Sequence, residues 1–424
     1  MSQRSLLRDA DFLKLWTGQT ISQLGSVVSR TALRLVALLT LGAGVAEMAY
    51  LVVAASLGVL LVGLAAGAWV DRLPRRPVLI WTDVIRAALL FSIPALAAAG
   101  TLRIEYLYVV AFLEACLGTL FNSAYHSYLP SLVGVDRLLE GNARLSQSSS
   151  IAEIGGPGFA GALVQVVSAP FAILVDAVSF AVSAISLIAI SAREAPRSRE
   201  FRRAIAREIA EGLRVVRTHA LVFPIAAVAV SEHFFGSFYA ALYTIYLLEV
   251  LGLTPLLLGI VVSAGGVGAL VGATVARPIV RRFGIGRSIV AMMLVTSTIG
   301  VLTPLAAGPL FVATLMVFLP QLIGDGTNTI QWVTQDSVVQ TAVPDRVLGR
   351  VNATLDVLAH GVATPAGALV AAAIAEAYGV RAGIWIAWLG GLATVLFIVF
   401  SPLRRVRSLD EIASARASDP SLTR

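Results

Sequence analysis

The chain has 424 residues, of which 57% are hydrophobic and only 13% are charged. Soluble domains carry about 25% charged residues, so the composition excludes an ordinary soluble domain and indicates a protein built for lipid. The net charge of +7 does not indicate a nucleic-acid partner, because the arginines stand in short clusters between apolar runs. The single cysteine, Cys116, supports neither a disulfide framework nor a Cys/His metal site.

Twelve apolar runs follow a polar N-terminal stretch, and each is long enough to cross the hydrocarbon core of a bilayer as a helix. The first run is predicted to be a retained span, since the N-terminus has no short apolar core with a cleavage site. The length of the runs and their lack of alternation exclude a transmembrane barrel, whose strands are about half as long. The predicted spans are 14–41, 46–70, 77–99, 105–129, 143–167, 170–191, 219–249, 255–276, 288–307, 309–334, 351–377 and 380–401.

The arginines alternate between the two sides of the predicted membrane. Loops after even-numbered spans carry most of them, whereas the odd-numbered loops show only Arg103 and Arg381, each near an acidic residue. Short basic loops stay in the cytoplasm, so both termini are predicted to be cytoplasmic.

A long central loop separates two halves that repeat each other. GAWVDRLPRRP at 67–77 has a counterpart in GATVARPIVRRFG at 272–284. The repeat predicts an all-α membrane protein of twelve helices in two six-helix bundles, related by a parallel pseudo-twofold repeat with the working cavity between them. Apolar residues at helical spacing in the central loop predict an amphipathic helix on the inner membrane surface. The predicted parts are an N-terminal bundle at 1–191, a cytoplasmic linker at 192–218, a C-terminal bundle at 219–402 and a cytoplasmic tail at 403–424.

The loop between the second and third predicted spans carries a pattern of its own. Gly67, Asp71, Arg72, Arg75 and Arg76 follow G-x-x-x-D-R-x-x-R-R. This pattern resembles the signature loop of the major facilitator superfamily, and the spans, the central loop and the repeat are similar to that family over essentially the whole chain. The aspartate ends its own helix, where the helix dipole disfavours a negative charge, so it needs another partner.

The resemblance implies that this partner is the start of span eleven, near Gly349 and Arg350. Such a contact would exist only when the cytoplasmic side is closed and would act as a conformational latch. The alternative is a plain positive-inside anchor. The second-half copy of the pattern has Ala276 in place of the aspartate and keeps Gly272, Arg277, Arg281 and Arg282.

Further phrases, such as DFLKLWTGQTISQLG at 11–25 and NSAYHSYLPSLV at 122–133, resemble the branch that contains the enterobactin exporter and macrolide-efflux proteins. In span five, Gly155, Gly156, Pro157 and Gly161 resemble the core of a motif of proton-antiport exporters. Proline removes a backbone hydrogen bond, and glycine permits a bend or close packing, so the segment is predicted to bend the helix or to pack it closely.

Ionisable residues inside spans are costly and are therefore candidates for function. Asp356 and His360 lie one turn apart and suit a proton relay, with a satisfied hydrogen-bonded pair as the alternative. Asp83 with Arg86, and Asp176, are interpreted as structural residues near membrane faces, and Asp83 is able to pair with the arginines at 72–76. The predicted proton-coupling residues are Glu153, Glu232, Asp325, Asp356 and His360, and Glu232 is equally a candidate counter-charge for a cationic drug.

Polar and aromatic residues within spans are the candidates for a substrate cavity. Arg30 and Arg34 share one face of span one, where they need acids, water or an anionic substrate. A buried structural ion pair of Arg30 with Glu47, Glu114 or Glu153 is the alternative. Aromatic rings can stack on a flat or cationic cargo. The full candidate set is Gln19, Gln23, Arg30, Arg34, Asn122, Phe235, Phe238, Tyr239, Asn328 and Gln331.

No Walker loop and no nucleophile constellation appears in the sequence, so an ion gradient is the predicted energy source and no cofactor is expected. The predicted function is proton-coupled export of drug-like or siderophore-like molecules by a monomeric secondary transporter of a bacterial cytoplasmic membrane. Its expected partners are the lipid bilayer, a small-molecule substrate and protons, without nucleic acid. The alternatives are an importer or facilitator of an anionic metabolite and a non-transporting receptor or scaffold.

Overall fold

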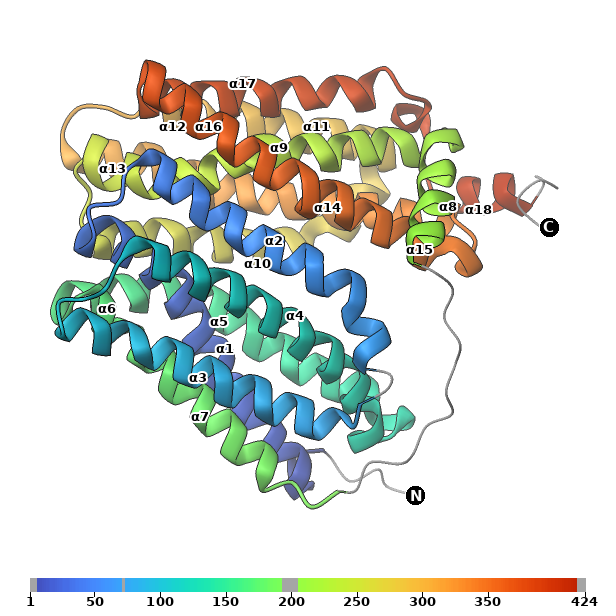
Figure 1. Ribbon diagram of the computed structural model, residues 1–424. Coiled ribbons are helices and arrows are strands. Elements are labelled where there is room, and N and C mark those ends of the chain that lie inside the picture. The colour runs from blue at the N-terminus through green and yellow to red at the C-terminus, as the bar shows by residue number, and fades with distance from the viewer. Residues whose placement is uncertain (1–5, 71–72, 193–204, 418–424) are drawn as a thin grey trace. The chain divides into compact units, whose positions relative to one another are not determined.

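The computed structural model describes residues 6–70, 73–192 and 205–417 (Figure 1). Every regular element in this part of the chain is a helix. The chain divides into two compact units, one made of 1–202 with 254–263 and the other of 203–253 with 264–424. Asp71 and Arg72 lie outside the described residues, as do 193–204 of the predicted linker.

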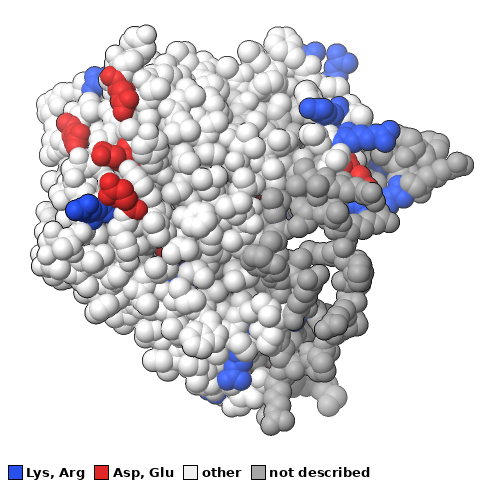
Figure 2. Space-filling view, in the orientation of Figure 1, with Lys and Arg blue, Asp and Glu red and all other residues white. Residues whose placement is uncertain are grey.

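Eleven helices of the described chain are long and apolar enough to cross a bilayer. The first helix does not meet that standard, because Arg30, Arg34 and several polar residues interrupt it. Figure 2 shows that charged side chains gather toward the ends of the helices and leave a wide zone almost free of charge. The prediction of an all-α membrane protein is confirmed.

Helices of the first unit approach each other through small residues. On α1, a side-chain carbon at Gly25 would stand 2.2 Å from Ser179 Oγ of α7, so glycine is needed for this contact. Helix α1 also packs on α5, α2 packs on α4, and α3 packs on both α4 and α7. The elements are η1 (Leu6–Arg8), α1 (Ala10–Leu35), η2 (Val36–Thr40), α2 (Val45–Val70), α3 (Arg75–Ala98), α4 (Ile104–Val133), η3 (Val135–Arg137), α5 (Leu138–Val167), α6 (Ala169–Ala172) and α7 (Leu174–Ile188).

The second unit follows the same principle. Helix α10 meets α14 backbone to backbone, since a side-chain carbon at Gly272 would stand 2.1 Å from the carbonyl oxygen of Gly326. Helix α10 (Pro255–Phe283) contributes 255–263 to the first unit and the rest to the second. The other transmembrane elements are α9 (Val222–Ile245), η4 (Tyr246–Val250), α11 (Ile285–Gly300), α12 (Leu302–Leu305), α13 (Leu310–Leu319), η5 (Pro320–Gly324), α14 (Asp325–Ala342), α15 (Asp345–Asp356), η6 (Val357–Ala363), α16 (Thr364–Tyr378) and α17 (Val380–Val399). The remaining elements are α8 (Ile205–Thr218), η7 (Pro402–Arg405) and α18 (Leu409–Ala417).

The amphipathic helix predicted in the central loop is α8, and it docks on the second unit. Gly212 lets α8 approach α15, because a side-chain carbon there would stand 2.4 Å from the carbonyl oxygen of Arg350. Arg350 Nη1 donates to Glu211 Oε2 at 2.6 Å. Contact with α15 therefore positions α8, and the Arg350 guanidinium already has an acidic partner inside its own unit.

Candidate functional site

A group of charged residues lies inside the helices of the first unit. Asp83 and Arg86 come from α3, Glu114 from α4 and Asp176 from α7; we call these four residues the charged cluster. Arg86 Nε donates to Glu114 Oε2 at 2.9 Å, and its guanidinium carbon stands 3.9 Å above the ring of Phe180. Arg86 and Glu114 both act electrostatically on Asp83 and on Asp176.

Asp83 and Asp176 are both buried inside the first unit. Asp83 is 0% exposed and Asp176 only 1%. Ser183 lies beside Asp83, but neither carboxylate oxygen of Asp83 has a well-formed hydrogen bond within the described chain. Asp176 Oδ1, by contrast, accepts from Ser179 Oγ at 2.8 Å. In the charged cluster, three carboxyl groups thus lie near one guanidinium group. The sequence did not reveal this excess of acidic groups, because the four residues lie on three separate helices.

Gln19 and Gln23 of α1 were predicted to line a cavity. Gln19 is 4% exposed and donates to Ser183 Oγ at 3.1 Å, so it packs inside the first unit rather than on a cavity wall. Gln23 is half-buried, and its Oε1 has no hydrogen-bond partner in the described chain.

The exposed cations of α1 lie further along the helix. Arg30 forms an ion pair with Glu153 of α5, and both side chains stay largely open, at 62% and 52% exposure. Glu153 is one of the acids named for a buried ion pair with Arg30, but the pair in the structure is exposed. Arg34 and Asn122 are also exposed.

In the second unit, Glu232 of α9 accepts a hydrogen bond from Gln331 Nε2 of α14 at 2.6 Å. Gln331 is 2% exposed and Phe238 is fully buried, so these two do not line an open cavity as predicted. Phe235 and Tyr239 are half-buried.

Two histidines meet where α9 passes η6. His233 Nε2 and His360 Nε2 are 3.2 Å apart, and His233 Nδ1 lies 2.8 Å from the carbonyl oxygen of Ala229. Because that carbonyl can only accept, a neutral His233 that bonds to it would carry its proton on Nδ1 and would accept from His360 Nε2. Asp356 Oδ1 lies 3.9 Å from His360 Nδ1. The predicted pair is therefore extended by His233, which no pattern in the sequence placed there.

Asp325 and Asn328 follow the π-helix η5 at the start of α14. Asp325 is half-buried against Gly265 of α10, where a side-chain carbon would stand 2.0 Å from Asp325 Oδ2, and Asn328 is exposed. Both η5 and η6 are π-helical, a form that is rare and often found at functional sites.

The glycine and proline motif of α5 serves close packing. Helix α5 runs unbroken through Pro157. A side-chain carbon at Gly161 would stand 2.2 Å from the carbonyl oxygen of Pro255, and one at Gly259 would stand 2.3 Å from that of Pro157. Gly156 contacts Val27 of α1 in the same way, whereas Gly155 has open space beside it.

The two arginines in the described part of the predicted latch bind backbone carbonyl groups of α4 and α7. Arg75 is buried and donates to the carbonyl oxygen of Ser127 at 2.9 Å. Arg76 donates to the carbonyl oxygens of Leu187 and Ile188 at 3.1 and 2.8 Å. Gly67 lies within α2, while Arg277, Arg281 and Arg282 of the second copy are exposed.

The family model described as transmembrane secretion effector matches residues 1–424. The chain belongs to this family of the major facilitator superfamily. It is 27% identical over 369 residues to the multidrug efflux pump Tap of Mycolicibacterium fortuitum, covering 84% of this chain and 87% of that protein. It is 25% identical over 410 residues to the macrolide efflux protein A of Streptococcus pyogenes, covering 94% and 97%.

Solved structures agree on the fold. The nucleoside transporter NupG superposes with a TM-score of 0.69 at 13% identity, covering 92% of this chain and 99% of that one. An inward-facing bacterial homologue of the iron transporter ferroportin gives 0.67 at 20% identity, covering 93% and 99%. These structures show the fold alone; the family match along the whole chain identifies it as a multi-pass membrane transporter and not an enzyme.

Proposed function

We propose that this transporter exports amphipathic small molecules from the bacterial cytoplasm in exchange for protons, by alternating access. Relatives named as multidrug or macrolide efflux proteins match along most of both chains, and they support the direction and the cargo class. Cytoplasmic termini and a monomeric state remain part of this proposal.

The charged cluster of the first unit is the observation that supports proton coupling. If all three of its carboxyl groups were ionised, Arg86 would leave two negative charges uncompensated among apolar helices. An ionised group within a span costs about 2.5 kcal/mol or more, so the cluster favours bound cations. A proton neutralises a carboxylate without further ligands, which suits the close packing around Asp83.

Transport in proteoliposomes with an imposed pH gradient tests this proposal. The wild type is expected to move a fluorescent amphipathic cation or a macrolide against its gradient when protons flow the other way. Asp83→Asn and Asp176→Asn should lower this gradient-driven accumulation about tenfold, which corresponds to roughly 1.4 kcal/mol of coupling, while downhill exchange of the cargo continues. Glu105→Gln, an exposed acid on α4, is the matched control.

Parallel arms use Glu153→Gln, Glu232→Gln, Asp325→Asn and His360→Gln, since these remain predicted coupling residues. Cargo movement that ignores the pH gradient would contradict proton exchange. Uptake of an anionic metabolite in place of the amphipathic cargo would support the importer alternative instead.

A further inference from the structure

The segment that follows the last membrane helix is fixed on the start of α11. The backbone N–H groups of Ile285 and Gly286 donate to the carbonyl oxygens of Arg407 and Val406 at 3.2 and 3.0 Å. Gly286 makes this approach possible, because a side-chain carbon there would stand 2.1 Å from the carbonyl oxygen of Leu403. The arginines of this segment are therefore held in place relative to α11.

An open groove of about 570 Å³ lies along this contact. Among the described residues that line it there is no Asp or Glu. Its apolar wall includes Phe283 and Leu294, which are 55% and 45% exposed. Its charged rim consists of four exposed arginines, Arg287, Arg404, Arg405 and Arg407.

The groove is placed where the polar surface of a membrane is expected. It lies at the first residues of α11 and the last residues of α17, and both helices are long and apolar enough to cross a bilayer. Lipid headgroups lie at the ends of spanning helices. The positive end of the α11 dipole adds to the attraction that the four guanidinium groups exert on an anion.

We propose that this groove binds the headgroup of an anionic phospholipid. Guanidinium groups bind phosphate oxygens in a bidentate manner. The exposed Phe283 and Leu294 would contact the start of an acyl chain, a surface that a free phosphate ion would leave in water. This site is independent of the cargo and of the direction of transport.

Native mass spectrometry of the detergent-purified full chain, titrated with cardiolipin, tests the proposal. The wild type is expected to retain one cardiolipin molecule at concentrations at which phosphatidylcholine does not bind. A triple variant, Arg404→Ala, Arg405→Ala and Arg407→Ala, should weaken cardiolipin binding by about tenfold to a hundredfold, because each basic residue near the surface adds to the attraction. Triple Arg→Gln variants at the same positions keep side-chain length in case the alanine variants fold poorly.

A control variant removes the same number of charges outside the groove. Arg217→Ala, Arg277→Ala and Arg281→Ala change exposed residues that do not line the groove, so binding should change less than about twofold. Arg282 is left in place because its guanidinium stands 5.6 Å from the ring of Phe283 in the groove wall. An equal loss in both triple variants, equal binding of phosphatidylcholine, or displacement of cardiolipin by millimolar inorganic phosphate would each overturn the proposal.

Discussion

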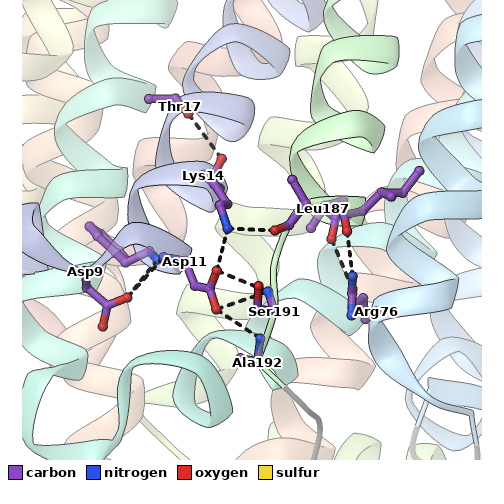
Figure 3. Close-up of polar contacts among 11 residues, drawn as sticks. Asp9, Asp11, Lys14, Thr17, Arg76, Leu187, Ser191 and Ala192 are labelled. Carbon is purple, nitrogen blue, oxygen red and sulfur yellow. Dashed lines mark hydrogen bonds and ion pairs between the residues drawn. The ribbon is translucent and has the colours of Figure 1, made fainter.

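The two units hold the chain after their last membrane helix by different means. In the first unit, side chains perform this role where the chain leaves α7 (Figure 3). Arg76 donates to the carbonyl oxygens of Leu187 and Ile188, and Lys14 Nζ donates to that of Ala189 at 2.7 Å. Cations at a helix C-terminus bind its free carbonyl groups and offset its dipole.

In the second unit, the backbone performs this role where the chain leaves α17. The free N–H groups at the start of α11 bind the carbonyl oxygens of Val406 and Arg407. Arginines of the repeated loop are therefore not needed as caps there, and Arg281 and Arg282 remain exposed. Two copies of one sequence pattern thus serve different purposes: the first stabilises a bundle from within, and the second leaves its charge at the surface.

The largest loss of stability is expected at Gly286, since its lack of a side chain lets 403–407 approach the start of α11 and form the backbone hydrogen bonds there. Gly286→Ala places a side-chain carbon 2.1 Å from the carbonyl oxygen of Leu403 and 2.5 Å from the carbonyl carbon of Arg404. Neither backbone atom can move freely, so we expect a loss of about 3 kcal/mol in stability, measured as a lower midpoint of thermal unfolding in detergent. Gly391→Ala, a glycine with open space beside it, is the control. Equal unfolding midpoints for the two variants would contradict the claim that the close backbone contact at Gly286 stabilises the second unit.

A smaller loss of stability is expected from changes in the first copy of the repeated loop, at 67–77, and almost none from changes in the second copy, at 272–284. Arg75→Ala removes a buried guanidinium from the carbonyl oxygen of Ser127, and we expect a loss of about 1–3 kcal/mol. Arg281→Ala changes an exposed side chain and should alter stability by less than about 0.5 kcal/mol. Thermal unfolding of both variants under one set of conditions measures the difference. If the two variants lose equal stability, the two copies have the same role and the comparison fails.

The sequence predicted the membrane helices well because their length and apolar character are local properties. It also predicted the pair of Asp356 and His360, since a spacing of four residues puts both on one helix face. It did not predict that His233 would meet His360, because that contact depends on how α9 packs against η6.

Because contacts between distant helices are not local properties, the sequence also did not predict the charged cluster or the burial of Gln19. Asp83, Glu114 and Asp176 are separated in sequence, and only the packing of α3, α4 and α7 shows that they share Arg86. Hydropathy also could not tell that Gln19 packs inward on Ser183. Glycine positions were visible in the sequence, but the atoms that approach Gly286 and Gly161 belong to distant segments.

A modest effect that depends on pH is expected at Asp11, which also helps to hold the chain after α7 in the first unit. Asp11 accepts from Lys14 Nζ at 2.9 Å and from the N–H groups of Ser191 and Ala192 at 3.1 and 3.0 Å (Figure 3). The hydrogen bond from Lys14 is the largest cause that holds the pKa of Asp11 below its ordinary value, and the two backbone N–H groups act in the same direction. A carboxyl whose pKa is lowered by folding stabilises the fold above its unfolded pKa of about 3.9. That stabilisation is lost as the pH falls through the lower folded value.

Asp11→Asn should therefore be less stable than the wild type at pH 7, by less than about 1 kcal/mol, because the pair is partly exposed and near the surface. The difference should shrink as the pH falls below about 3.9 and then disappear. Lys14→Met should shift that loss of stability toward pH 3.9, since it removes the main cause of the lowered pKa. Thermal unfolding of the three proteins across this pH range measures the effect. A difference between wild type and Asp11→Asn that grows on acidification would show that the contact with 191–192 does not depend on the ionised carboxylate.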